Sequence, residues 1–264
     1  MFLINSFMIV ILFMLSLAIP VSSFILPVYK IKKMRTLTFR SKIFANLIAM
    51  GIIGAISPKL LVMYFIFFIP IEVLYYYFNN MNPAVEKFDR IVIISLTVTV
   101  LMSIFVYLVR DDLQNGMNLI GQFYEQYLDL NPTEVKAIFE SLKSNIIFYI
   151  FDYSILCVFF LYICVDLNHY EKWKISFEWL LLYIVPFFLV QIFKISNLYT
   201  INILKVGELI FTFYGIKTTY GFLAKYIRFK FLNNFVAFAL AIQFPFPMFL
   251  IGVIGGFFTK KNNK

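Results

Sequence analysis

The sequence predicts an all-α protein, a polytopic bundle of transmembrane helices. Of its 264 residues, 62% are apolar and only 14% are charged, whereas a soluble domain usually has about half and about a quarter. With a mean hydropathy of +0.86, this composition excludes a soluble enzyme, a disordered segment and a disulfide-rich secreted module. A full span needs about 20 apolar residues. We expect about eight such membrane segments in a single integral membrane domain, residues 1–264.

The first apolar stretch runs from Phe2 to Tyr29. Pro20 and Pro27 interrupt it, and a proline inside a helix removes a backbone hydrogen bond and kinks or ends that helix. The stretch is therefore either one kinked span or a dip broken at Pro20, which would bring the N-terminus to the cytoplasmic side. It lacks the basic n-region of a secretory signal.

A short basic loop follows and sets the orientation. It has no acidic residue and these basic ones: Lys30, Lys32, Lys33, Arg35, Arg40 and Lys42. Short basic loops stay in the cytoplasm. Contact with a nucleic acid is the alternative interpretation, but the position between two apolar stretches favours topology. We expect residues 30–42 in the cytoplasm and no nucleic-acid partner.

Three further spans are expected before the largest polar region. Residues 43–78 divide into two at Ser57-Pro58-Lys59, and residues 91–109 form a fourth span without any charge. Small residues four positions apart let helices approach closely, and the second span carries two such pairs. They are Ala45 with Ala49, and Gly51 with Ala55. This face is expected to approach another helix closely.

The polar region, residues 110–144, is expected to be an external helical insert. It holds twice as many acidic as basic residues: Asp111, Asp112, Glu125, Asp129, Glu134 and Glu140 against Arg110, Lys136 and Lys143. Asn131 and Pro132 mark a helix start, with Asn as N-cap and Pro at the first helical position. We expect an amphipathic helix that continues from Pro132 without a break through the fifth span to Val165, roughly 51 Å in length.

Three more apolar stretches follow, residues 178–193, 199–223 and 231–258. The last is interrupted by Pro245 and Pro247. Its basic tail favours the cytoplasm, whereas eight full spans from an external N-terminus would leave the C-terminus outside. A hairpin at the two prolines would resolve this conflict, so the path of the last stretch stays open.

Five polar residues within the spans are the candidate substrate-binding residues: Glu72, Asp152, Gln191, Lys205 and Glu208. Charges within a bilayer are costly and are functional candidates. If the last four converge, they form a polar site in the outer half of the bundle, with residues 111–144 as its cover. The structural alternatives are a lysine partner or backbone donors for Glu72, an interfacial position for Asp152, and mutual neutralisation of Lys205 and Glu208 on one helix face.

Several kinds of chemistry are not expected. The single histidine, His169, supplies no histidine-based metal site or catalytic triad. Cys157 and Cys164 lie about two helical turns apart, too far for a disulfide. The sequence has no Walker phosphate-binding motif. We therefore expect no enzyme, no metal and no cofactor, and we expect that the chain cannot power pumping by itself.

Four groups of residues carry a resemblance. They are residues 124–134, followed by Phe177-Glu178-Trp179-Leu180; residues 213–217 with 220–223; Gly252 with Gly255; and Leu26-Pro27-Val28-Tyr29. These segments resemble the YybS-like family of multi-pass bacterial membrane proteins of unknown function. The N-terminal segment is shorter here than the first two spans of that family, and no acidic residue follows the last glycine.

The resemblance implies two functions. The family is remotely similar to the substrate-binding S components of energy-coupling-factor transporters and to MreD-like cell-shape proteins. The first hypothesis is therefore S-component-like binding and uptake of a small solute in the cell membrane, with a separate partner membrane subunit and an ATPase acting in trans. The resemblance implies that the small-residue face of Ala45, Ala49, Gly51 and Ala55 docks that partner, and packing of this face inside the monomer is the alternative. The alternative is a non-transporting scaffold or accessory subunit of a cell-envelope complex. A membrane enzyme would need clustered acids or histidines with a nucleophile, which the sequence lacks.

Overall fold

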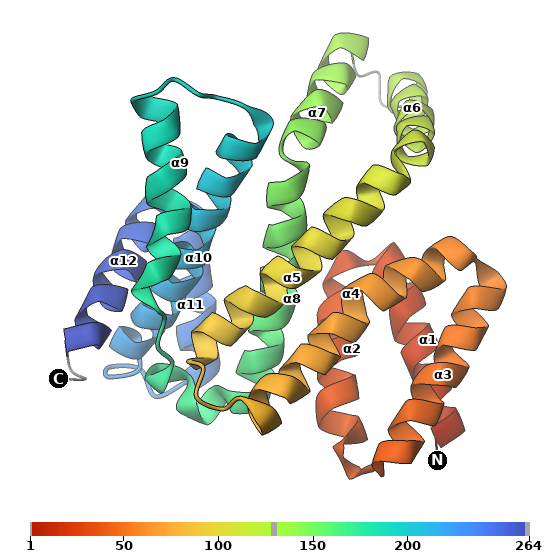
Figure 1. Ribbon diagram of the computed structural model, residues 1–264, viewed down its shortest axis with the longest axis horizontal. Coiled ribbons are helices and arrows are strands. Elements are labelled where there is room, and N and C mark those ends of the chain that lie inside the picture. Colours follow the sequence, from red (N-terminus) through yellow and green to blue (C-terminus); the bar gives the residue numbers. More distant parts are fainter. Residues whose placement is uncertain (1, 128–130, 262–264) are drawn as a thin grey trace.

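The computed structural model describes residues 2–127 and 131–261, and every regular element in these two ranges is a helix (Figure 1). Four helices are long and apolar enough to cross a membrane: α3 (Phe39–Ile56), α4 (Pro58–Tyr76) with η4 (Tyr77–Met81), α5 (Lys87–Leu108) and α8 (Ile146–Asp166). A bent pair near the C-terminus makes a fifth if it counts as one span. The predicted all-helical fold with helices able to cross a membrane is confirmed, whereas the number of eight spans and the external position of the helical insert stay predictions.

The N-terminal stretch is a hairpin of short helices. α1 (Phe2–Ala18) ends before Pro20, and η1 (Pro20–Phe24) turns the chain into α2 (Ile25–Val28) and η2 (Tyr29–Lys33). The Tyr29 hydroxyl donates a 2.6 Å hydrogen bond to Asn5 Oδ1, so the two ends of the stretch lie side by side. Of the two paths left open by the sequence, the structure has the one broken at Pro20.

The breaks between the next helices lie at the predicted residues. After η3 (Met34–Thr36), the Thr38 side chain caps the start of α3. Ser57 is extended, and Pro58 begins α4, where the missing N–H of proline costs no helical hydrogen bond. Arg90 at the start of α5 is buried and donates to the carbonyl oxygens of Pro83 and Val85, which fixes the turn between α4 and α5.

The polar region forms two amphipathic helices, α6 (Arg110–Tyr127) and α7 (Pro132–Ser144), which project from one end of the bundle (Figure 1). The Asn131 side chain accepts from the Thr133 N–H, so the predicted cap is confirmed. The predicted unbroken helix from Pro132 to Val165 is wrong. It breaks at Asn145 (φ −114°, ψ 16°), and α8 starts anew at Ile146.

The last part of the chain contains short helices around one long helix. After η5 (Leu167–Lys172) come η6 (Phe177–Leu180) and α9 (Leu181–Gln191), then α10 (Leu198–Leu223), whose 26 residues span roughly 39 Å. α11 (Lys230–Gln243) and α12 (Pro245–Lys261) are bent by 118° at the break between them. The last stretch is therefore sharply bent at the predicted prolines.

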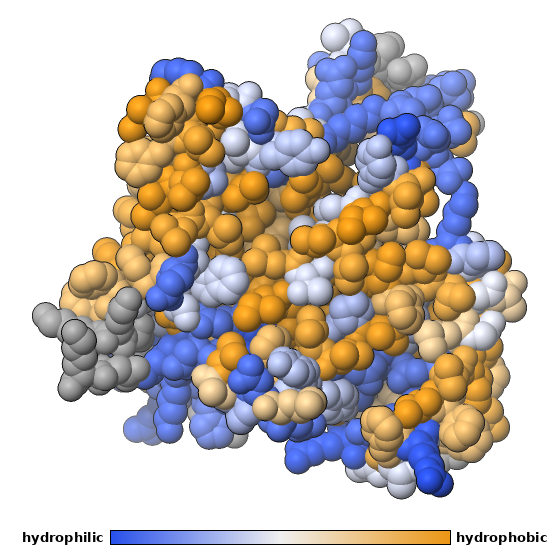
Figure 2. Space-filling model, in the orientation of Figure 1, coloured by the Kyte–Doolittle hydropathy of each residue, from blue (hydrophilic) through white to orange (hydrophobic). Residues whose placement is uncertain are grey.

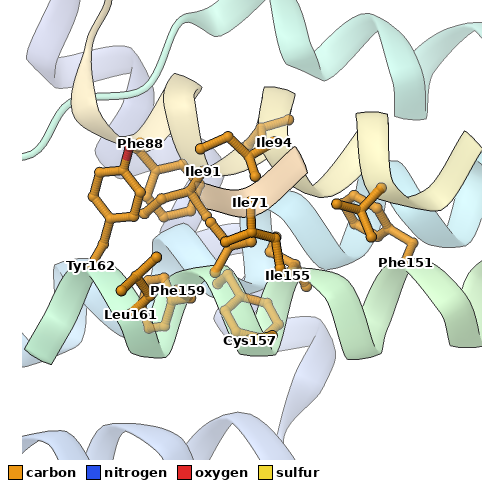
Figure 3. Close-up of a cluster of buried hydrophobic side chains, with 14 of the residues drawn as sticks. Ile71, Phe88, Ile91, Ile94, Phe151, Ile155, Cys157, Phe159, Leu161 and Tyr162 are labelled. Atoms are coloured by element: carbon orange, nitrogen blue, oxygen red, sulfur yellow. The ribbon is translucent and has the colours of Figure 1, made fainter. Parts of the chain in front are cut away.

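The hydrophobic core is one continuous cluster that draws on most of the helices, and Figure 3 shows the part of it between α5 and α8. Apolar side chains of both helices meet there around Ile71 of α4; the buried residues include Phe88, Ile91, Ile94, Phe151, Ile155, Cys157, Phe159, Leu161 and Tyr162. At Gly215 and Gly252, α10 and α12 pack backbone against backbone. A Cβ at Gly215 or Gly252 would overlap a backbone carbonyl of the facing helix, so only glycine allows this approach.

The two ends of the bundle differ. In Figure 1, the start of α1, the end of α12 and the segment 30–42 all lie in the lower part, and α6 and α7 lie at the top. Figure 2 shows apolar side chains over the middle of this face and hydrophilic ones over α6, α7 and the lower edge. We call the two ends the basic end and the α6–α7 end. A polar, apolar, polar sequence of bands is what a protein immersed in a bilayer presents.

Candidate functional site

A pocket of about 460 Å³ opens between α8, α10 and α11. Most of its lining is apolar, including Phe148, Leu156, Leu209, Phe213, Ile216, Phe238, Ala241, Ile242 and Pro245, and Thr212 adds a hydroxyl. Its three charged residues are Asp152 of α8 with Lys205 and Glu208 of α10. Three of the four residues expected to converge therefore do line one pocket.

One wall of the pocket lies at the bend between α11 and α12. The 14 residues of α11 reach roughly 21 Å, less than the hydrocarbon thickness of about 30 Å. Ala241, Ile242 and Pro245 at the bend line the space beside α10. Lys205 and Glu208, one turn apart on α10, face that space.

Lys205 does not form a close ion pair with Glu208. Its Nζ donates a 2.6 Å hydrogen bond to Asn145 Oδ1 and lies 5.6 Å from the centre of the Phe148 ring. Among the described residues, no ion pair within 4.0 Å joins Lys205 to Glu208. The lysine instead holds the residue at which α7 ends and α8 begins.

Asn202, which the sequence analysis missed, holds the same junction. Its side chain is fully buried, accepts from the Phe148 N–H at 2.8 Å, and donates to the Ser144 carbonyl at 2.7 Å. These bonds satisfy backbone groups that the break at Asn145 leaves without a helical partner. The available signal was a polar residue one turn before Lys205 in an apolar helix.

Gln191 and Glu72 lie elsewhere. Gln191 ends α9 with an exposed side chain and does not line the pocket. Glu72 forms a buried ion pair with Lys30, at 2.5 Å between Oε2 and Nζ, and Lys30 also donates to the Tyr64 hydroxyl. The structural alternative, a lysine partner, is the one the structure shows for Glu72. Lys30 is thus an interior residue, whereas Lys32, Lys33, Arg35 and Arg40 of the same loop are exposed.

The expected cover does not line the pocket. α6 and α7 enclose a separate polar groove of about 490 Å³, whose lining includes Gln114, Asn118, Lys136, Glu140 and Lys143. None of these residues lines the pocket between α8 and α10. The link between the two places is Asn145, which ends α7 and accepts the hydrogen bond of Lys205.

The small-residue face is divided. Ala45 and Ala49 are fully buried inside the monomer, where α3 packs on α1 and α4. The docking prediction is corrected for these two residues, because a partner chain could not reach them. Gly51 and Ala55 lie on the exposed side of the same helix, and no neighbour stands within 4 Å of a Cβ built at Gly51.

A second polar cluster at the basic end was also missed. Asp89 accepts from the Ser176 N–H, the Ser176 hydroxyl and Trp179 Nε1, and Asp166 pairs with Lys87, His169 and Trp173 Nε1. Beside it, burial raises the pKa of Tyr170 well above its usual value, so this phenol stays neutral. These carboxylates are saturated by donors, which indicates that they anchor the loop between α8 and α9.

The arrangement offers no metal centre. Across residues 2–127 and 131–261, no group of three or more His, Cys, Asp or Glu side chains is placed to hold a metal ion. Cys157 and Cys164 are both free thiols, and Cys157 is buried.

Comparison with protein-family models, with curated proteins and with solved structures finds no match to this chain.

Proposed function

We propose that the chain binds a small solute in the pocket between α8, α10 and α11, as the membrane-embedded capture subunit of an uptake system. The observation that carries the proposal is the assembly of Asp152, Lys205 and Glu208 in one otherwise apolar pocket of about 460 Å³. Small-molecule sites commonly measure about 300–1,000 Å³ and combine an apolar lining with a few placed polar groups.

The broken helix beside the pocket supports this proposal. Irregular backbone at membrane depth is tolerated where it is buried in protein or lines a cavity. Transporters place their substrates at such discontinuous helices. The bend between α11 and α12 contributes Ala241, Ile242 and Pro245 to the pocket wall.

The proposed orientation puts the basic end in the cytoplasm and the α6–α7 end outside. Exposed Lys32, Lys33, Arg35 and Arg40 supply the positive charge that retains a short loop inside. The pocket then lies toward the outer side, since Lys205 is bonded to the residue that ends α7. Energy for uptake would come from a separate membrane subunit with its ATPase.

The test is to identify what co-purifies with the full-length protein. The wild type and Ala241→Phe, which fills the pocket, are purified in mild detergent, and their small-molecule extracts are compared by mass spectrometry. We expect a compound present with the wild type and absent with the variant. Ala55→Phe, on the exposed side of α3, is the matched control and should retain the compound.

Protein partners are identified from the same samples. Co-purifying transporter ATPases would support the proposal. Cell-wall or division proteins, together with small molecules that are identical in wild type and Ala241→Phe, would instead favour the non-transporting scaffold. Glu208→Gln, a near-isosteric change in the pocket, provides a second variant in case Ala241→Phe fails to fold.

A further inference from the structure

The pocket contains more negative than positive charge. It has two carboxylates, Asp152 and Glu208, and one lysine, Lys205, whose Nζ donates a hydrogen bond to Asn145 Oδ1 rather than to either carboxylate. In the part of the chain that the structure describes, neither carboxylate forms a side-chain hydrogen bond or an ion pair within 4.0 Å, and Lys205 acts on Glu208 only as a more distant charge. Both side chains are half-buried.

In lacking a close donor, Asp152 and Glu208 differ from the other half-buried or buried acids among the described residues. Glu72, Asp89 and Asp166 each have donors or a basic partner. A carboxylate removed from water without a partner is costly, particularly at membrane depth. Asp152 and Glu208, on facing helices α8 and α10, therefore have acceptor capacity that a ligand can satisfy.

The rest of the pocket lining indicates what kind of molecule would carry the hydrogen-bond donor for these two carboxylates. Phe148, Phe213 and Phe238 line the pocket together with aliphatic side chains. Aromatic faces attract organic cations, and they also cover apolar surface. The lining thus suits a molecule with a positively charged nitrogen at one end and an apolar body at the other.

We infer that the ligand is a small organic amine, whose ammonium group is held between Asp152 and Glu208 while its apolar body lies against Phe148, Phe213 and Phe238. This inference rests on the proposed function, since it names the solute class of the same pocket. The ammonium would supply the hydrogen-bond donors that both carboxylates lack.

The test compares three probes of nearly equal shape. The full-length protein in lipid nanodiscs is titrated calorimetrically with 2-phenylethylamine, with neutral 2-phenylethanol and with anionic 3-phenylpropionate, and empty nanodiscs give the blank. We expect saturable binding of the amine, with an affinity at least about tenfold above that of the alcohol. Asp152→Asn and Glu208→Gln should each weaken amine binding roughly tenfold to hundredfold, as expected for loss of a charge-assisted hydrogen bond.

The matched control is Asp111→Asn, an acid at the start of α6 with a 94% exposed side chain outside the pocket, which should leave amine binding unchanged. Equal binding of amine and alcohol would overturn the inference. If Ala241→Phe then blocks the binding of both probes, the proposed solute pocket still stands. Tighter binding of phenylpropionate would make Lys205 the recognising group and also overturn it. Absence of saturable binding for all three probes would overturn it too, and the co-purification experiment would decide the proposed function separately.

Discussion

Gly215 of α10 and Gly252 of α12 face each other. The backbone of α12 occupies the space that a side chain at Gly215 would need, and the backbone of α10 occupies that of a side chain at Gly252. A Cβ at Gly252 would overlap the Phe211 carbonyl oxygen, and one at Gly215 would overlap that of Met248. Backbone atoms cannot move aside as the end of a flexible side chain can. This contact holds α12, and with it the bend that borders the pocket, against α10.

Gly252→Ala should therefore lower the free energy of unfolding in detergent by about 1–3 kcal/mol, the usual cost of overpacking. Gly221→Ala is the control on α10, since a Cβ there meets nothing within 4 Å. It should be neutral or slightly stabilising, because alanine favours a helix over glycine by about 0.5–1 kcal/mol. Equal stability of the two variants would contradict the close packing of α10 on α12.

The buried Lys30–Glu72 ion pair predicts that removing one of the two charges is strongly destabilising, whereas removing both is much less so. Glu72→Gln leaves a lysine that is only 1% exposed without its counter-charge, and breaking a buried pair in this way costs about 3–5 kcal/mol. The double variant Lys30→Met/Glu72→Gln removes the stranded charge and should recover most of that stability, measured by denaturant unfolding. A double variant as unstable as Glu72→Gln would show that the pair is not the cause.

The exposed Lys59–Asp112 pair is the control for that experiment. Both side chains are more than half exposed, at 66% and 60%, and exposed pairs contribute little. Asp112→Asn should leave the unfolding midpoint unchanged within error.

The anchored loop between α8 and α9 gives a spectroscopic prediction. The only two tryptophans, Trp173 and Trp179, donate their indole N–H groups to Asp166 and Asp89 respectively. Asp89→Ala leaves three donors without this acceptor, so we expect a red-shifted tryptophan emission and a loss of roughly 1.5–3 kcal/mol of stability. Asp111→Asn should change neither quantity, and an unaltered emission in Asp89→Ala would argue against the Trp179 contact.

The proposed orientation predicts which cysteines a membrane-impermeant reagent can label in intact cells. In a Cys164→Ser background, in which the remaining Cys157 is buried, Glu140→Cys on α7 should react from outside. Arg35→Cys in the basic loop should react only after permeabilisation. Labelling of both positions in permeabilised cells checks that each variant is folded and exposed, and the reverse pattern in intact cells would invert the topology.

Local sequence was sufficient for the elements whose cause is local. Hydropathy alone identifies α5 and α8, because a helix long enough to cross the hydrocarbon core has to be apolar whichever helices it packs against. Proline and the N-cap residues locate the start of α4 at Pro58, the start of α7 at Pro132 and the break before Pro245, because those residues act on their own backbone. The intramembrane charges could likewise be named as candidates from their cost in lipid.

What only the tertiary structure decided depends on contacts between residues far apart in the chain. Glu72 finds Lys30, Asp152 meets Lys205 and Glu208 across the pocket, and the helix after Pro132 stops at Asn145, where Asn202 and Lys205 bind the junction from α10. No local pattern encodes such pairings, since many partners are compatible with the same hydropathy. The sequence thus determined a helical membrane protein with a few costly charges, and packing determined which of those charges share a pocket and which neutralise one another.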